Sequence, residues 1–269
     1  MTTGVLIFAY NNELVDYLAM ANWAAKNIRR HLNLPIAVVT DQPCPSKYRF
    51  EQVIIAQPTS SFLRKFADQE ENVTWYNGNR VDAYLLSPWA HTLVLDADYV
   101  VASNDLLKIL SIDKNFVAHK TAYDVVNKDN FNELNNFGRH NMPMWWATVM
   151  MFRRSTEAKL IFETMTMIRD NWDHYKALYG ITKSTYRNDF ALSIAMNIVD
   201  GHTLSTPSIP WPLMSLTSLS RITQLEPDTY RIDYENSDTE GKPKWILLKN
   251  QDFHAMGKKS LGDIVANPC

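Results

Sequence analysis

The segment from Gly4 to Thr40 constrains the fold more than any other part of the sequence. It contains two short apolar runs, GVLIFAY (4–10) and IAVVT (36–40). Between them, from Glu13 to Leu32, apolar residues recur at intervals of three, four or seven, which is the spacing of a helix. A strand, a helix and a second strand without a hairpin turn form a βαβ unit. The sequence therefore predicts a parallel pair of strands that is buried on both faces.

The alternation of strands and helices continues through the rest of the chain. We predict further strands at 52–56, 92–98, 115–120, 147–153 and 244–249, and further helices at 79–87, 105–110, 155–179 and 187–199. In this interpretation Asn11 or Asn12 caps the first helix. Residues 121–145 form a long loop, and the pattern becomes irregular after Gly201. The pattern favours an α/β fold class and a single domain over 1–269.

Composition limits the classes of function. The 269 residues carry a formal net charge of -2, which gives none of the basic excess that is typical of general nucleic-acid binders. The two cysteines, Cys44 and Cys269, are too few for a disulfide framework, so a reducing compartment is the simpler interpretation. The sequence shows no signal peptide and no apolar segment long enough to span a membrane. We therefore expect a cytoplasmic protein.

Two carboxylates interrupt the apolar run LVLDADYVV (93–101). Burial of ionised carboxylates is costly unless they have partners. Asp96 lies at or near the end of a predicted strand, and Asp98 is two residues further along, so in an extended chain both side chains point the same way. Such a pair can bind one hard cation such as Mg²⁺ or Mn²⁺, which leaves coordination positions for a phosphate group. The alternative is a pair of ordinary turn aspartates.

The stretch from Arg80 to Asp98, RVDAYLLSPWAHTLVLDAD, resembles the core of the GT-A-fold glycosyltransferases. It is most similar to the family that includes glycogenin and bacterial lipopolysaccharide galactosyltransferases. In that family a basic residue opens a helix, and the following strand ends in a D-x-D motif that binds Mn²⁺ and the diphosphate of a nucleotide sugar. The resemblance assigns diphosphate binding to Arg80 and Asp96, and metal binding to Asp96 and Asp98.

A late segment extends the resemblance. The family supplies its third metal ligand from an H-x-x-G-x-x-K segment, and this chain has HAMGKKSL (254–261). His254 and Gly257 match, which implies that His254 is a metal ligand and that Gly257 allows the diphosphate to approach closely. Ser260 stands where the family has lysine, so Lys258 and Lys259 are the candidates for the diphosphate contact.

Two further segments carry the resemblance less closely. The IFAYNNE run resembles the nucleotide-binding first strand, which implies that Tyr10 stacks on the base and that Asn11 reads its edge; an ordinary strand-to-helix turn is the alternative. Near 187–189 the family has a D-Q-D-like helix start beside the donor sugar. Asn188 and Asp189 match its last two positions and are the catalytic candidates, whereas Arg187 replaces the first aspartate.

The resemblance implies a GT-A-type Rossmann-like fold with a mixed, mostly parallel sheet and helices on both faces. Residues 1–120 would bind the nucleotide sugar, and residues 121–269 would supply the acceptor half and the late metal ligand. The expected function is metal-dependent transfer of a hexose or pentose from a nucleoside-diphosphate sugar, with a UDP-sugar favoured, to an acceptor hydroxyl. Mn²⁺ or Mg²⁺ is the expected cofactor. The acceptor stays open between a glycan, a lipid-linked glycan, a protein and a modified DNA base, although the net charge gives the last no support.

Two other functions remain as alternatives. A haloacid-dehalogenase-like phosphatase also has a D-x-D motif after an apolar strand, but that motif usually lies early in the chain and precedes a threonine, where this chain has Val100. A non-catalytic nucleotide-sugar-binding protein would bind the donor without turning it over.

Overall fold

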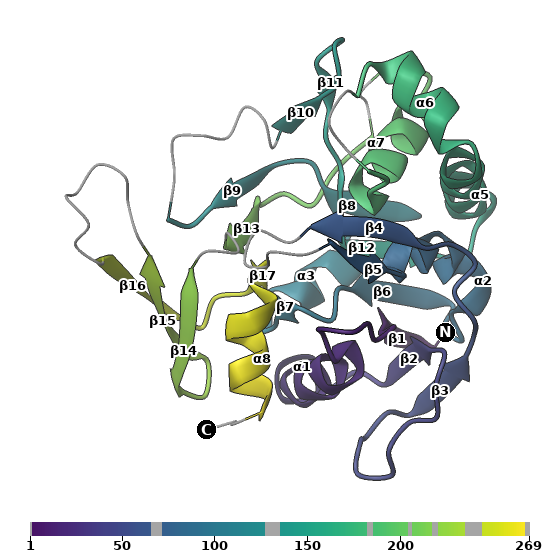
Figure 1. Ribbon diagram of the computed structural model, residues 1–269. Coiled ribbons are helices and arrows are strands. Elements are labelled where there is room, and N and C mark those ends of the chain that lie inside the picture. The colour runs from purple at the N-terminus through teal and green to yellow at the C-terminus, as the bar shows by residue number, and fades with distance from the viewer. Residues whose placement is uncertain are drawn as a thin grey trace.

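A six-stranded mixed sheet organises the molecule (Figure 1). The computed structural model describes residues 2–65, 72–126, 135–181, 185–203, 206–216, 220–234 and 244–266. The strand order is β3–β2–β1–β6–β12–β8. The strands are β1 (Thr3–Phe8), β2 (Ile36–Thr40), β3 (Gln52–Ile55), β6 (His91–Leu95), β8 (Phe116–His119) and β12 (Trp146–Arg153). Within this sheet only β12 runs antiparallel to its neighbours, which confirms the predicted mixed, mostly parallel fold class.

The chain reverses its direction across the sheet beside β1. From β1 it adds β2 and β3 on one side, and then returns to place β6 on the other side of β1. The carboxyl ends of β1 and β6 therefore lie next to each other at a topological switch point. In open α/β sheets this is where ligands bind.

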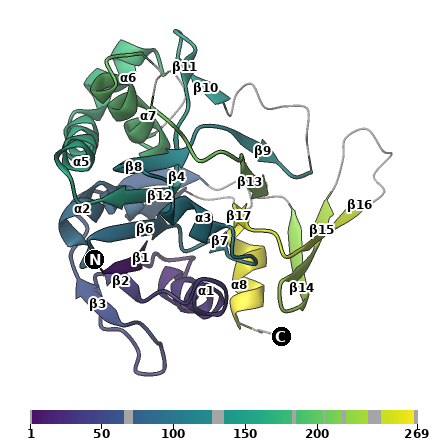
Figure 2. The same cartoon turned by 180° about the vertical axis from the view of Figure 1, so that it is seen from behind.

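The helices and the smaller sheets surround the central sheet. The helices are α1 (Tyr17–Leu32), the 3₁₀ helix η1 (Asn77–Asp82), α2 (Ala83–Leu86), α3 (Leu106–Leu110), α5 (Thr156–Asp170), α6 (Trp172–Tyr179), α7 (Asn188–Val199) and α8 (Lys258–Ala266). Every residue of β2 and β8 is buried. Because successive side chains of a strand point to opposite faces, both faces of the sheet are covered. Helices α1 and α8 lie side by side in both views (Figures 1 and 2).

Two smaller sheets and two short pairs of strands complete the described structure. A four-stranded sheet has the order β7–β17–β13–β9, a three-stranded sheet has the order β14–β15–β16, and the pairs β4–β5 and β10–β11 are antiparallel. Their bounds are β4 (Phe62–Lys65), β5 (Asn72–Trp75), β7 (Tyr99–Val100), β9 (Ala122–Asp124), β10 (Asn136–Phe137), β11 (Met142–Pro143), β13 (Leu213–Leu216), β14 (Arg221–Glu226), β15 (Thr229–Tyr234), β16 (Lys244–Lys249) and β17 (Phe253–Ala255).

Two helix boundaries differ from the sequence prediction. Helix α1 begins at Tyr17 rather than at Glu13, because the Asn12 side chain accepts the amides of Leu14 and Val15 and holds a turn there. Asp16 is the cap of this helix. The single helix predicted at 155–179 is two helices, since Asn171 adopts non-helical backbone angles between α5 and α6.

Within the described residues, no helix combines the length and the apolar character that a membrane crossing requires.

Candidate active site

The D-x-D motif forms a tight turn at the carboxyl end of β6. The strand ends at Leu95, and the amide of Tyr99 donates to the carbonyl of Asp96 at 3.1 Å. The prediction of an extended strand through residue 98 is therefore wrong, because the chain turns before it continues as β7. Both carboxylates are nevertheless buried within one small cavity at the switch point.

Strand pairing brings His254 to this turn from the far end of the sequence. Strand β17 pairs antiparallel with β7, which places His254 opposite Tyr99. The amide of Ala255 donates to the carbonyl of Asp98 at 3.0 Å and fixes the register. The Nε2 atom of His254 lies 3.3 Å from Oδ2 of Asp98 and 3.8 Å from Oδ2 of Asp96. The sequence prediction that these three side chains meet is thus matched by their positions.

The three side chains suit one divalent cation. Their candidate ligand atoms all lie within 4.8 Å of one another. An ion such as Mg²⁺ binds its ligands at about 2.1 Å, so neighbouring ligand atoms lie roughly 3 Å apart and opposite ones roughly 4 Å apart. The distances from Nε2 of His254 to the two carboxylates, 3.3 and 3.8 Å, fall within that range. Carboxylate oxygens and imidazole nitrogen are ligands that Mn²⁺ and related ions accept.

Two basic side chains bind the same carboxylates. Arg80, in η1, forms an ion pair with Oδ1 of Asp96 and donates to the carbonyl of Ala147 at 3.0 Å. Lys258, the first residue of α8, forms an ion pair with Oδ2 of Asp98. The side chains of both cations are 9% exposed, which makes them part of the cavity wall rather than of the solvated surface. Each carboxylate is therefore neutralised within the chain itself.

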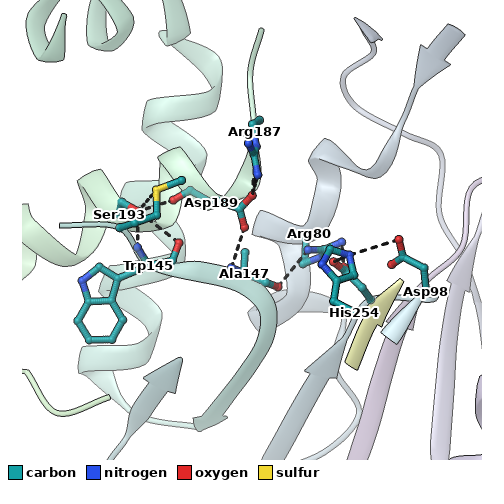
Figure 3. Close-up of polar contacts among 10 residues, drawn as sticks. Arg80, Asp98, Trp145, Ala147, Arg187, Asp189, Ser193 and His254 are labelled. Atoms are coloured by element: carbon teal, nitrogen blue, oxygen red, sulfur yellow. Dashed lines mark hydrogen bonds and ion pairs between the residues drawn. The ribbon is translucent and has the colours of Figure 1, made fainter. Parts of the chain in front are cut away.

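Asp189 lies on the other side of the cavity, at the start of α7 (Figure 3). Its Oδ1 atom accepts the amide of Ala147 at 3.0 Å, and its Oδ2 atom accepts Nη2 of Arg187 at 2.7 Å. Burial alone would raise the pKa of Asp189, but the Arg187 guanidinium and the Ala147 amide outweigh burial and lower that pKa below its usual value. With both oxygens occupied and a lowered pKa, Asp189 is a weak base.

Only some of the remaining predicted site residues line this cavity. Asn188 lines the cavity and accepts the hydroxyl of Tyr186 at 3.2 Å. Gly257 is buried directly before α8, and Lys259 is exposed and lines a separate groove between α1 and α8. Tyr10 is 1% exposed and packs within the core. Their roles in binding the nucleotide sugar stay predictions.

Asn11 has a structural role in the described conformation. Its Oδ1 atom accepts the amide of Leu18 at 2.9 Å, and its Nδ2 atom donates to Asp16 at 3.0 Å. It therefore supports the first turn of α1, and its predicted contact with a base stays a prediction.

Several residues that line the cavity were not among the sequence candidates. They are Phe8, Tyr17, Trp75, Ala97, Thr148, Arg187 and Met256. Trp75 lies in β5, which pairs antiparallel with β4. The sequence analysis predicted neither strand, because it recognised no alternation of apolar and polar residues there. Arg187 was visible in the sequence as a departure from the D-Q-D pattern and as a basic neighbour of Asp189, and these were the signals that could have identified it.

Among solved structures, the chain is similar to glycosyltransferases. The apo form of the glycosyltransferase GlyE from Streptococcus pneumoniae TIGR4 is 14% identical, with a TM-score of 0.44, and the match covers 78% of this chain and 45% of that one. A second GlyE structure is 13% identical, with a TM-score of 0.43 and coverage of 78% and 46%. The galactosyltransferase LgtC in complex with donor and acceptor sugar analogues is 13% identical, with a TM-score of 0.46 and coverage of 70% and 69%.

The chain spans less than half the length of the GlyE chains that it matches. No protein-family model and no curated protein matches the sequence.

Proposed function

We propose that the protein is a metal-dependent glycosyltransferase that takes a sugar from a nucleoside-diphosphate sugar. The observation that carries this proposal is the convergence of Asp96, Asp98 and His254 with the cations Arg80 and Lys258 at the switch point of the sheet. Two acidic ligands, one imidazole and two basic side chains are suited to a diphosphate that binds together with a divalent ion. UDP is the nucleotide that the resemblance favours.

In the proposed reaction, the bond between the anomeric carbon and the diphosphate oxygen breaks, and a bond from that carbon to an acceptor oxygen forms. The acceptor hydroxyl gives its proton to the departing diphosphate oxygen or to solvent, and the nucleoside diphosphate leaves with the electron pair of the broken bond. Asp96, Asp98 and His254 would hold Mn²⁺ or Mg²⁺, which supplies positive charge beside the leaving oxygen when it is bound. Arg80 and Lys258 add charge on either side of the leaving group, because each already lies against one of the metal-binding carboxylates.

Asn188 and Asp189 would orient the donor sugar from the N-terminus of α7. The lowered pKa of Asp189 and its contact with Arg187 favour a positioning role over proton abstraction. The acceptor would enter the same cavity and bind against the half of the chain that follows residue 120.

The experiment that tests this proposal is a calorimetric titration of UDP, GDP, CDP, ADP and their sugars in the presence and absence of Mn²⁺. We expect one nucleotide to bind in a Mn²⁺-dependent manner. We expect the corresponding nucleotide sugar to be hydrolysed slowly in the absence of an acceptor. A chain that binds no nucleotide under either condition would contradict the proposal. Release of phosphate from simple phosphoesters would instead favour the phosphatase alternative, and tight binding without hydrolysis or transfer would favour a binding protein.

A further inference from the structure

The charged residues that line the cavity form three matched pairs. Among the described residues, its charged lining consists of three cations and three carboxylates, besides His254. The pairs are Arg80 with Asp96, Lys258 with Asp98, and Arg187 with Asp189. Two pairs adjoin the candidate metal site. The Arg187–Asp189 pair lies further off, separated from His254 and Asp98 by Ala147 and Arg80 (Figure 3). The lining is therefore electrically neutral, with no excess charge to balance a charged ligand.

This neutrality sets the charge of the ligand that fits best. A divalent cation adds two positive charges, and the diphosphate of a nucleotide sugar adds two negative charges. The filled cavity is then neutral again only if the sugar carries no charge. A carboxylate on the sugar would leave one negative charge without a partner in a buried site, which is unfavourable.

The third pair is built rigidly. Nε and Nη2 of Arg187 lie 3.2 and 2.7 Å from Oδ2 of Asp189. The guanidinium lies over the rings of Trp146 and Phe190, at 5.9 and 5.4 Å from their centroids. The amide of Ala147 holds the other oxygen of the carboxylate. These contacts hold the Arg187 guanidinium in place, and the Asp189 carboxylate balances its charge.

The position of this pair assigns it to the sugar. A donor that binds through its diphosphate at Asp96 and Asp98 has its nucleoside on one side and its sugar on the other. Near the end of β1 and the start of α1 the cavity is lined by Phe8 and Tyr17, and the nucleoside would lie on that side. The sugar then extends across the cavity, towards the start of α7.

We propose that the Arg187–Asp189 ion pair makes this chain select an uncharged donor sugar over a sugar that bears a carboxylate. The inference rests on the proposed glycosyltransferase function, and it names the class of donor. Asp189 is the residue that enforces the selection, because it keeps the Arg187 guanidinium neutralised. Removal of the Asp189 charge would free Arg187 to bind a carboxylate, which guanidinium groups do strongly.

The test compares the binding of UDP-glucose and UDP-glucuronic acid by calorimetry in the presence of Mn²⁺, with UDP alone as the reference. If the nucleotide panel selects guanosine, GDP-mannose, GDP-mannuronic acid and GDP take their places. We expect the wild-type chain to bind the uncharged sugar at least about tenfold more tightly than the acidic one, since Arg187 is already paired with Asp189 and the carboxylate of the acidic sugar would be buried beside that pair.

Asp189→Asn is the decisive variant, because asparagine retains an oxygen for the Ala147 amide but carries no charge. We expect its preference to shift by at least about tenfold towards the acidic sugar. The double variant Arg187→Gln/Asp189→Asn removes both charges and should return the preference towards the uncharged sugar. Unchanged affinity for UDP in every variant shows that the fold and the diphosphate site are intact.

The outcomes separate this inference from the function on which it rests. Binding of UDP with an unchanged sugar preference in Asp189→Asn overturns the inference alone. A wild-type preference for the acidic sugar also overturns it. Failure of every nucleoside diphosphate to bind in the presence of Mn²⁺ overturns the proposed function, and the inference with it.

Discussion

Asp98 contacts two other side chains of the candidate site and the strand that carries one of them. Its carboxylate meets Lys258 and His254, and its carbonyl accepts the amide of Ala255. The side chain therefore connects the D-x-D turn to the late His254 segment, and it is also a candidate metal ligand. A substitution here that keeps the size and shape of the side chain tests the charge alone.

We predict that Asp98→Asn weakens Mn²⁺-dependent nucleotide binding by at least about tenfold, since even outer-shell substitutions at metal sites have effects of 10–100-fold. Asp105→Asn is the matched control, because Asp105 pairs with Lys108 on the surface, with its side chain 48% exposed. Calorimetric titration of UDP in the presence of MnCl₂ measures both variants. Equal losses in the two variants, or none in Asp98→Asn, would show that Asp98 does not bind the metal.

His119, a buried residue of β8, gives a prediction on stability. Burial lowers the pKa of its imidazole from 6.5 to about 4, although the Trp211 carbonyl, 2.9 Å from Nδ1, opposes this shift. Between these two pH values the unfolded chain binds a proton that the folded chain does not. The free energy of unfolding therefore falls as the pH is lowered from about 6.5 to about 4, by an amount on the order of 3 kcal/mol from this residue.

We predict that His119→Gln reduces this loss of stability at acidic pH, because glutamine does not titrate. Urea unfolding of the wild type and the variant at pH 7 and at pH 4.5 measures the effect. His174→Gln is the control, since His174 is exposed. The same pH dependence in the wild type and in His119→Gln would contradict the prediction.

At the scale of elements, the sequence predicts the parts that depend on local pattern. The βαβ unit is recognisable because β1 and β2 are continuous apolar runs and α1 has helical spacing. The β7–β17 pairing could not be derived in this way, because it joins two very short strands that lie far apart in the chain. The position of His254 in the site followed only from the resemblance to a known family.

Two glycines in different elements give opposite predictions. In β1, a Cβ atom on Gly4 would overlap the buried indole of Trp89, whose Nε1 donates to the carbonyl of Val5. We predict that Gly4→Ala lowers the free energy of unfolding by about 1–3 kcal/mol. In α8, the nearest atom to a Cβ on Gly262 is Cε of Met20 at 3.9 Å.

Gly262→Ala serves as the control, because alanine fits there without a clash. We predict that it raises the free energy of unfolding by up to about 1 kcal/mol, since glycine is the poorer helix former. Urea unfolding at neutral pH measures both variants. Gly4→Ala as stable as the wild type would show that the indole of Trp89 can move away at little cost.

At the scale of the whole molecule, the strand order explains where the site lies. The switch between β1 and β6 places the carboxyl ends of two neighbouring strands beside η1, α7 and α8. The sequence predicted β1 and β6 and most of the charged residues of the site. It did not predict the Arg187–Asp189 pair as a wall of the cavity, because that wall depends on how α7 packs against β12.

Arg80 and Lys258 also affect the stability of the fold when the candidate metal site holds no cation. Asp96 and Asp98 each form an ion pair with a basic side chain of the chain itself. Removal of a divalent cation would therefore not leave two carboxylates that repel each other without compensation. We predict that EDTA abolishes nucleotide binding but leaves the melting temperature within about 2 °C of its value in plain buffer, a change that corresponds to about 1 kcal/mol or less. Unfolding in EDTA, followed by circular dichroism, would contradict this. A cation at the candidate metal site would then be needed for nucleotide binding but not for the stability of the fold.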